Sequence, residues 1–241
     1  MLKNIQPLND GFHQNPLFKV NLRAKRIVFR LDQKIGRPVI VLPHKSYLNK
    51  AERYRDAFNT WISTVHIPSK KTLDDGECIL YQGRMHQICF IPEPLYSKAR
   101  VEVTQETYTL SDNRLRVLGR KDHMNAAIQG FLLKEAQNYA LKMSQFYAQA
   151  LGVTLGKTTI RDLKSMWGRC MRQRDLCYNW RLILAPPHVF DYVCAHEVSH
   201  CLHPNHSRDF WETVSHICPH STQSRLWLKQ NSKELFSYSL E

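Results

Sequence analysis

The stretch CAHEVSHCLHPNHSRDFW, Cys194–Trp211, decides the fold of the C-terminal part of the chain and contains four histidines and one glutamate. His196 and His200 are four residues apart, so on a helix they share one face and can bind the same cation. Glu197 lies about 100° further round that helix, where its carboxylate reaches a water on the metal rather than the metal itself. The stretch therefore predicts a helix with an HExxH metal site and Glu197 as its general base.

A third protein ligand is expected, because catalytic zinc commonly has three protein ligands and an exchangeable water. His203 and His206 are the two candidates. His203 would lie about 10 Å along the axis from His196 if the helix continued. His206 follows Pro204, which ends the helix and lets the chain return to the metal. We therefore expect His206 as the third ligand, with His203 and Asn205 in supporting positions around the ligands.

The ligand set also indicates the metal and the reaction. Three imidazoles favour zinc, with nickel, cobalt and manganese as alternatives. Such an ion would lower the pKa of a bound water to about 7, and Glu197 would take the proton. Chance gives HExxH only about 0.02 times in a chain of this composition. The motif thus predicts a metal-dependent hydrolase, without saying which bond it cleaves.

Composition and charge indicate the number of domains, the location and the kind of partner to expect. The chain has 241 residues, 43% of them hydrophobic, which is enough for one large or two modest globular domains. It has no apolar run of about 18 residues and no secretory signal pattern, so we expect no membrane partner. Seven cysteines without a CxxC pair indicate reduced thiols and a cytoplasmic location. A net charge of +13 favours nucleotides, nucleic acid or acidic proteins as partners.

The hydrophobic pattern predicts an α+β fold. Residues 1–20 are expected to be a leader and residues 21–121 a β-rich subdomain with one helix, over 49–65. Its strands are expected at 26–31 and 38–43, followed by a hairpin over 77–90 that turns at Gln82-Gly83 and another over 100–119.

Residues 122–241 are expected to form the C-terminal metal-binding domain, which begins with a long connecting helix over 122–150. TTIRDL (158–163) and CYNWRLILAP (177–186) are interpreted as strands of a short sheet, on either side of a loop. Pro186-Pro187 then opens the helix that carries HEVSH, and HSRDFWETVSHI (206–217) begins another helix.

Four segments of this C-terminal part occur in order and at close spacing: KSMWGRC (164–170), YNWRLILAPP (178–187), DYVCAHEVSH (191–200) and NHSRDFW (205–211). Together they resemble the YgjP-like family of metal-dependent hydrolases. KRIVFRL (25–31) and LDDGECILYQG (73–83) extend the resemblance over nearly the whole chain. The resemblance implies a zincin-type metallopeptidase domain whose ligands are His196, His200 and His206 and whose catalytic carboxylate is Glu197. Met166 and Arg169 depart from the family pattern, which affects the expected substrate contacts and not the metal.

Arg169 and Arg181 are the candidate substrate-binding residues, since a guanidinium can stabilise an oxyanion or hold a phosphate, although ordinary salt bridges would also explain them. Three functions remain open at this point. The first is a zinc metallopeptidase acting on peptides or proteins, and the second is a metal-dependent phosphohydrolase acting on nucleotides. The third is a nucleic-acid-associated binding protein that docks through its basic β-rich half. We expect the metallopeptidase, because the motif and the resemblance both favour it.

Overall fold

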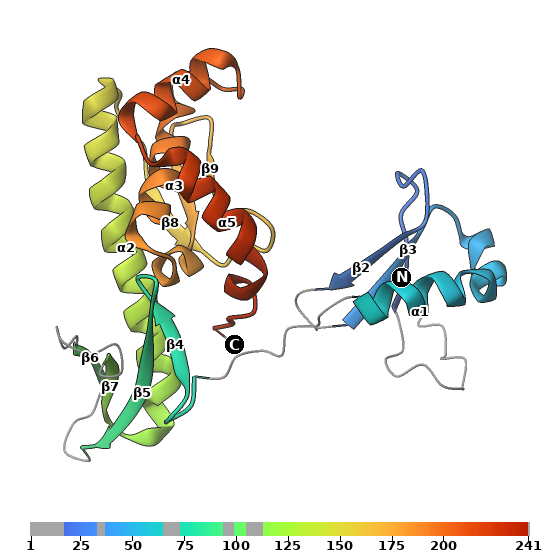
Figure 1. Cartoon of the computed structure of the whole chain (residues 1–241), viewed down its shortest axis with the longest axis horizontal. Helices are drawn as coiled ribbons and strands as arrows, with labels where there is room; N and C mark the ends of the chain where they lie inside the picture. The colour runs from blue at the N-terminus through green and yellow to red at the C-terminus, as the bar shows by residue number, and fades with distance from the viewer. Residues whose placement is uncertain (1–16, 33–36, 65–72, 94–98, 105–112, 241) are drawn as a thin grey trace. The chain divides into compact units, whose positions relative to one another are not determined.

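The computed structural model describes residues 17–32, 37–64, 73–93, 99–104 and 113–240. The chain divides into two compact units, Met1–Ser69 and Lys70–Glu241 (Figure 1). The architecture is mixed α+β, as the sequence predicts. The domain boundaries expected after residues 20 and 121 stay predictions, although the last four residues of the expected leader form strand β1 (Leu17–Val20).

The N-terminal unit is a three-stranded sheet with a helix packed on one face. Its strand order is β1-β3-β2, with β1 parallel and β2 (Val28–Asp32) antiparallel to the central β3 (Arg37–Leu42). A 3-10 helix η1 (Lys45–Tyr54) leads into α1 (Arg55–Thr64). Phe58 of α1 is buried with Ile40 and Leu42 of β3, and its ring contacts Phe29 and Trp61. This small apolar cluster joins the helix to the sheet.

A four-stranded sheet opens the C-terminal unit, in the order β4-β5-β7-β6, and comprises β4 (Cys78–Tyr81), β5 (Arg84–Pro92), β6 (Arg100–Thr104) and β7 (Arg114–Gly119). The first predicted hairpin is confirmed: Gln82 and Gly83 both have positive φ, 50° and 76°, as a tight two-residue turn requires. A Cβ on Gly83 would lie 2.7 Å from Cγ of Pro186. Glycine therefore lets this turn approach the segment that leads into the HExxH helix. The β6–β7 pair is antiparallel, and its turn lies outside the described residues.

A second, short sheet has the order β8-β10-β9, from β8 (Thr158–Arg161), β9 (Gly168–Cys170) and β10 (Leu176–Asn179). Here the structure differs from the prediction twice. Strand β9 lies inside the expected loop, and the strand expected over 177–186 ends at Asn179, after which Trp180–Leu184 form the 3-10 helix η3. The Asn179 side chain explains the second difference, because its Oδ1 accepts the Arg181 N–H at 3.1 Å and caps η3.

Three helices complete the C-terminal unit. Helix α3 (Pro187–Ser199) carries HEVSH and begins with proline in its first turn, as predicted. Helix α4 (Arg208–Ile217) also follows the prediction. Its N-cap is Ser207, whose Oγ accepts the Phe210 N–H at 3.3 Å. Helix α5 (Ser221–Leu235) was not predicted; it buries Ser224, Leu228 and Leu235.

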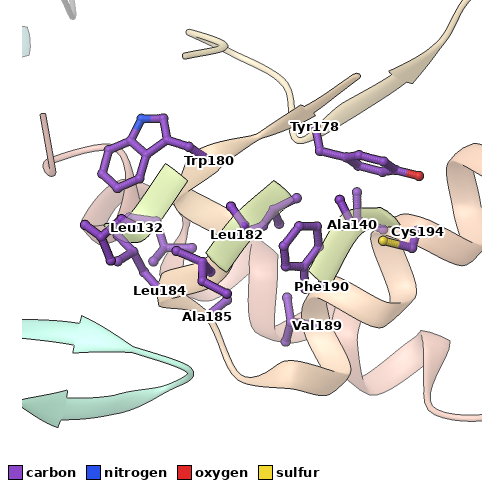
Figure 2. Packing of buried hydrophobic residues seen from close by; sticks show 14 of the residues in the cluster. Leu132, Ala140, Tyr178, Trp180, Leu182, Leu184, Ala185, Val189, Phe190 and Cys194 are labelled. Atoms are coloured by element: carbon purple, nitrogen blue, oxygen red, sulfur yellow. The ribbon is translucent and has the colours of Figure 1, made fainter. Parts of the chain in front are cut away.

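The long predicted helix is α2 (Met124–Leu151), which follows a 3-10 turn η2 (Lys121–His123) and ends before Gly152 with its left-handed φ of 63°. Residues four apart along it are buried, including Ile128, Leu132, Ala136 and Ala140, and the alanines allow close packing against α3, β8 and η3. Figure 2 shows Leu132 and Ala140 among the buried side chains of η3, β10 and α3. This core holds the HExxH helix in place.

The structure also bears on the expected state of the cysteines and on membrane-spanning helices. All seven cysteines are free thiols. Among the helices of the described chain, none is both long and apolar enough to cross a bilayer.

Candidate metal centre

Three imidazoles converge at the end of α3 and in the loop that follows it. His196 and His200 come from successive turns, and His206 returns from beyond Pro204. One ligand atom of each histidine lies within 4.8 Å of the others, and Nε2 of His196 is 3.1 Å from Nε2 of His206. Two nitrogens held tetrahedrally on one zinc ion lie about 3.3 Å apart, so the observed spacing fits a shared metal ion.

The orientation of His200 is fixed by a backbone contact. Its Nδ1 lies 3.0 Å from the carbonyl oxygen of His203. Because a carbonyl only accepts, Nδ1 carries the proton and Nε2 keeps its lone pair for a metal. The side chain of His203 takes no part in the cluster, and its Nε2 instead contacts Oγ1 of Thr213 at 3.2 Å. His203 therefore supports a ligand through its backbone.

Aromatic rings surround the three histidines. Phe210 is fully buried, and its ring centroid lies 4.9, 4.5 and 4.8 Å from those of His196, His200 and His206. Trp211 stacks on His206, with centroids 5.6 Å apart and an interplanar angle of 26°. Sequence reasoning did not assign Phe210 a place beside all three ligands, although the segment NHSRDFW contains it. These rings hold the imidazoles in their positions.

The environment of His196 and His200 favours the neutral form of these two imidazoles. Burial, and then the neighbouring His200 and His206, lower the pKa of His196 to about 3, and burial lowers the pKa of His200. A neutral imidazole is the form that binds a metal. Nδ1 of His196 is buried and has no hydrogen-bond partner within the described chain, so the neighbouring rings of Tyr192 and Phe210 orient it by packing.

Glu197 lies beside these ligands and is buried, with 5% of its surface exposed. Strand β9 presses against it, since the Cys170 N–H donates to its carboxylate and a Cβ on Gly168 would lie 2.7 Å from Oε1. Burial raises the pKa of Glu197 to about 8. The carboxylate thus has a high proton affinity, as a general base working near neutral pH requires.

A family model described as YgjP-like, metallopeptidase domain, matches residues 39–231, most of the chain. The chain belongs to the YgjP-like family. The matched region includes all three histidines and Glu197, and membership makes the chain a metal-dependent hydrolase. No curated protein and no solved structure matches this YgjP-like chain significantly.

The other predicted site residues of this YgjP-like chain lie apart from the histidine cluster or at the surface. Arg181 is buried, and its Nε and Nη2 donate to the Tyr238 carbonyl at 2.9 and 2.7 Å. Its Nη1 also forms an ion pair with Asp162. Arg169 is exposed on β9, and Asn205 is exposed in the loop before α4. The substrate-binding roles of the two arginines and the supporting role of Asn205 stay predictions.

One residue near the YgjP-like site was missed by sequence reasoning. Arg225 of α5 is exposed, and its Cζ lies 4.8 Å from the Trp211 ring that stacks on His206. Its positive charge contributes to lowering the pKa of His196, and within the described chain it forms no salt bridge. No pattern in the sequence connects Arg225 to the motif, because the folding of α5 onto α3 brings it there.

Proposed function

We propose that the protein is a zinc-dependent peptidase in which Glu197 acts as the general base. The observation that carries this proposal is the buried Glu197 carboxylate beside three converging imidazoles. Three imidazole nitrogen donors with an adjacent carboxylate suit zinc, with nickel, cobalt and manganese as the alternative ions. When bound, zinc supplies Lewis-acid chemistry that acidifies a water molecule and polarises a substrate carbonyl.

The residues of the chain would bind the ion, orient its ligands and transfer the proton. His196, His200 and His206 would hold the ion, and the His203 carbonyl would keep the Nδ1 proton on His200. The Glu197 carboxylate would accept a proton from the attacking water and pass it to the leaving amine. The Cys170 N–H would keep that carboxylate oriented throughout the cycle.

The edge of the short sheet supports a peptide as the substrate. The Trp167 carbonyl, just before β9, accepts from the Asn179 N–H, and the Met171 N–H, just after β9, donates to the Asp175 carbonyl. Arg169 of β9 is in register with Cys177 between them, so the odd-numbered residues pair with β10 and its adjoining segment. The backbone groups of Gly168 and Cys170 therefore face away from β10. The Cys170 N–H already donates to Glu197 there, and no other strand of the described chain pairs with this edge. An extended peptide could add to this edge as a further strand, beside Glu197.

The test compares the zinc-loaded wild type with Glu197→Gln on two substrate classes. Peptides from a casein digest are incubated with each protein, and new termini are read by mass spectrometry. Nucleoside triphosphates are incubated in parallel, and released phosphate is measured. We expect peptide cleavage by the wild type, about 1,000-fold slower cleavage by Glu197→Gln, equal zinc content in both, and no release of phosphate.

Two results would overturn the proposal. Phosphate release that Glu197→Gln abolishes would make the protein a phosphohydrolase acting on nucleotides. Peptide cleavage that is unchanged in Glu197→Gln at equal zinc content would remove Glu197 from the reaction.

A further inference from the structure

The positive charge of the chain is concentrated at its N-terminal end. Residues 17–64 contain 11 lysines and arginines against three aspartates and glutamates, so they hold +8 of the net charge of +13. The metal centre lies in the other unit. This excess of positive charge therefore belongs to the unit that does not contain the histidine cluster.

Strand register places two of these cations on the same face of the sheet. Lys19 of β1 is in register with Val41 of β3, and Arg30 of β2 is in register with Val39. Ile40, between these valines, points to the opposite face, where it packs with Phe58 of α1. Because side chains alternate along a strand, Lys19 and Arg30 lie on the face away from α1.

The loop between β1 and β2 adds three cations in an ordered turn. The Asn21 N–H donates to the Leu42 carbonyl at 2.9 Å, the Ala24 N–H donates back to the Asn21 carbonyl at 2.9 Å, and the Arg23 N–H donates to Oδ1 of Asn21 at 3.1 Å. This turn presents exposed side chains from Arg23, Lys25 and Arg26.

We define the basic cluster as Lys19, Arg23, Lys25, Arg26 and Arg30, all of them exposed. In the part of the chain that the structure describes, none of the five forms an ion pair. Like charges repel one another in the folded protein, and a polyanion that binds across them relieves this repulsion.

The chemistry of this face favours a phosphate backbone over other anionic partners. Val39 and Val41 are buried, with 2% and 6% exposure. Among the residues of β1, β2 and β3 that the structure describes, none places an aromatic ring on this face for a base to stack on. The exposed apolar side chains do not form one plane for insertion into lipid, since Leu17 and Val28 lie on this face and Phe18 on the other.

We propose that the N-terminal unit binds nucleic acid through the basic cluster, by contacts to phosphates and without reading the base sequence. Such binding loses affinity steeply with salt, because each neutralised phosphate releases condensed counterions. Five contacts give a slope of about −4.5 in a plot of log K against log salt concentration.

The experiment measures fluorescence anisotropy of a short fluorescein-labelled DNA duplex with the full chain, from about 50 to about 200 mM NaCl. The test variant is Arg23→Gln/Lys25→Gln/Arg26→Gln, whose side chains are exposed. At the lowest salt we expect it to bind at least tenfold more weakly than the wild type, with a slope reduced to about −1.8. The wild type and the variant should each bind a second duplex of unrelated sequence with the same affinity as the first duplex.

The matched control removes the same number of charges from exposed helical positions of the other unit, as Lys134→Gln/Lys229→Gln/Lys233→Gln. Circular dichroism checks that each variant is folded, and the salt slope of the wild type alone tests the proposal if a variant fails to fold. We expect the control to bind within twofold of the wild type. Equal weakening in the control would overturn the proposal, as would a wild-type slope near zero. Binding to vesicles of phosphatidylserine and phosphatidylcholine in preference to the duplex would also overturn it, by assigning the cluster to a lipid surface.

Discussion

Gly168 of β9 lies so close to Glu197 of α3 that a Cβ at position 168 would be 2.7 Å from Oε1, 2.8 Å from Cγ and 3.0 Å from Cδ of the glutamate. The carboxylate is buried and also accepts the Cys170 N–H, so it has little room to move aside. Glycine at this position thus sets where the proposed general base stands relative to the three histidines.

Gly168→Ala should therefore lower activity without removing the metal. The added methyl displaces the Glu197 carboxylate, and a misplacement of about 1 Å at a reacting group costs about 100-fold in rate. We expect kcat to fall by that order while zinc content stays at the wild-type level, as measured by atomic absorption. Full activity in the alanine variant would show that the position of Glu197 does not limit the reaction.

Arg181 should contribute to stability rather than to substrate binding. Its guanidinium joins η3 to the C-terminal segment through the Tyr238 carbonyl and pairs with Asp162. Hydrogen bonds to a charged group contribute about 2 kcal/mol in such a position. We expect Arg181→Ala to lose about that much free energy of unfolding in urea titrations. A raised KM with unchanged stability would instead support the predicted role in substrate binding.

His86 should make the stability of the protein depend on pH. It is fully buried, its Nδ1 donates to the Arg84 carbonyl at 3.0 Å, and its Nε2 has no partner within the described chain. Burial lowers the pKa of His86. The unfolded chain therefore takes up a proton on this ring at a higher pH than the folded protein does, and stability falls as the pH drops below about 6.5.

The matched variant for this effect is His86→Asn, whose amide can keep the hydrogen bond to Arg84. Its free energy of unfolding, measured from pH 7.5 down to pH 5.5, should depend less steeply on pH than that of the wild type. The other histidines with lowered pKa are present in both proteins and cancel in the comparison. If the free energy of unfolding depended equally steeply on pH in the wild type and in His86→Asn, the acid sensitivity would belong to the other histidines and not to His86.

The parts of the fold that followed from the sequence are those that local chemistry determines. The four-residue spacing of His196 and His200, the break at Pro204 and the turn at Gln82-Gly83 each indicate their structure within a few residues. The return of His206 to the cluster could be expected because His206 is the first histidine after the break at Pro204.

The parts that the sequence did not predict depend on contacts between distant segments. Strand β9 is only three residues long and forms because Arg169 pairs with Cys177 of β10, so no local pattern predicts it. The contact of Phe210 with all three ligands and the approach of Arg225 to Trp211 result from the packing of α4 and α5 around α3. Periodicity reports which face of a helix is apolar, and not which neighbour it meets.

The metal content of two histidine variants tests the metal centre most directly. Purified wild type, His206→Ala and His203→Ala are loaded with zinc, dialysed and analysed by atomic absorption. We expect about one zinc ion per chain in the wild type and in His203→Ala, whose backbone carbonyl still orients His200. His206→Ala should lose most of its zinc while staying folded by circular dichroism. Wild-type zinc content in His206→Ala, or loss of zinc in His203→Ala, would contradict the assignment of His196, His200 and His206 as the ligands.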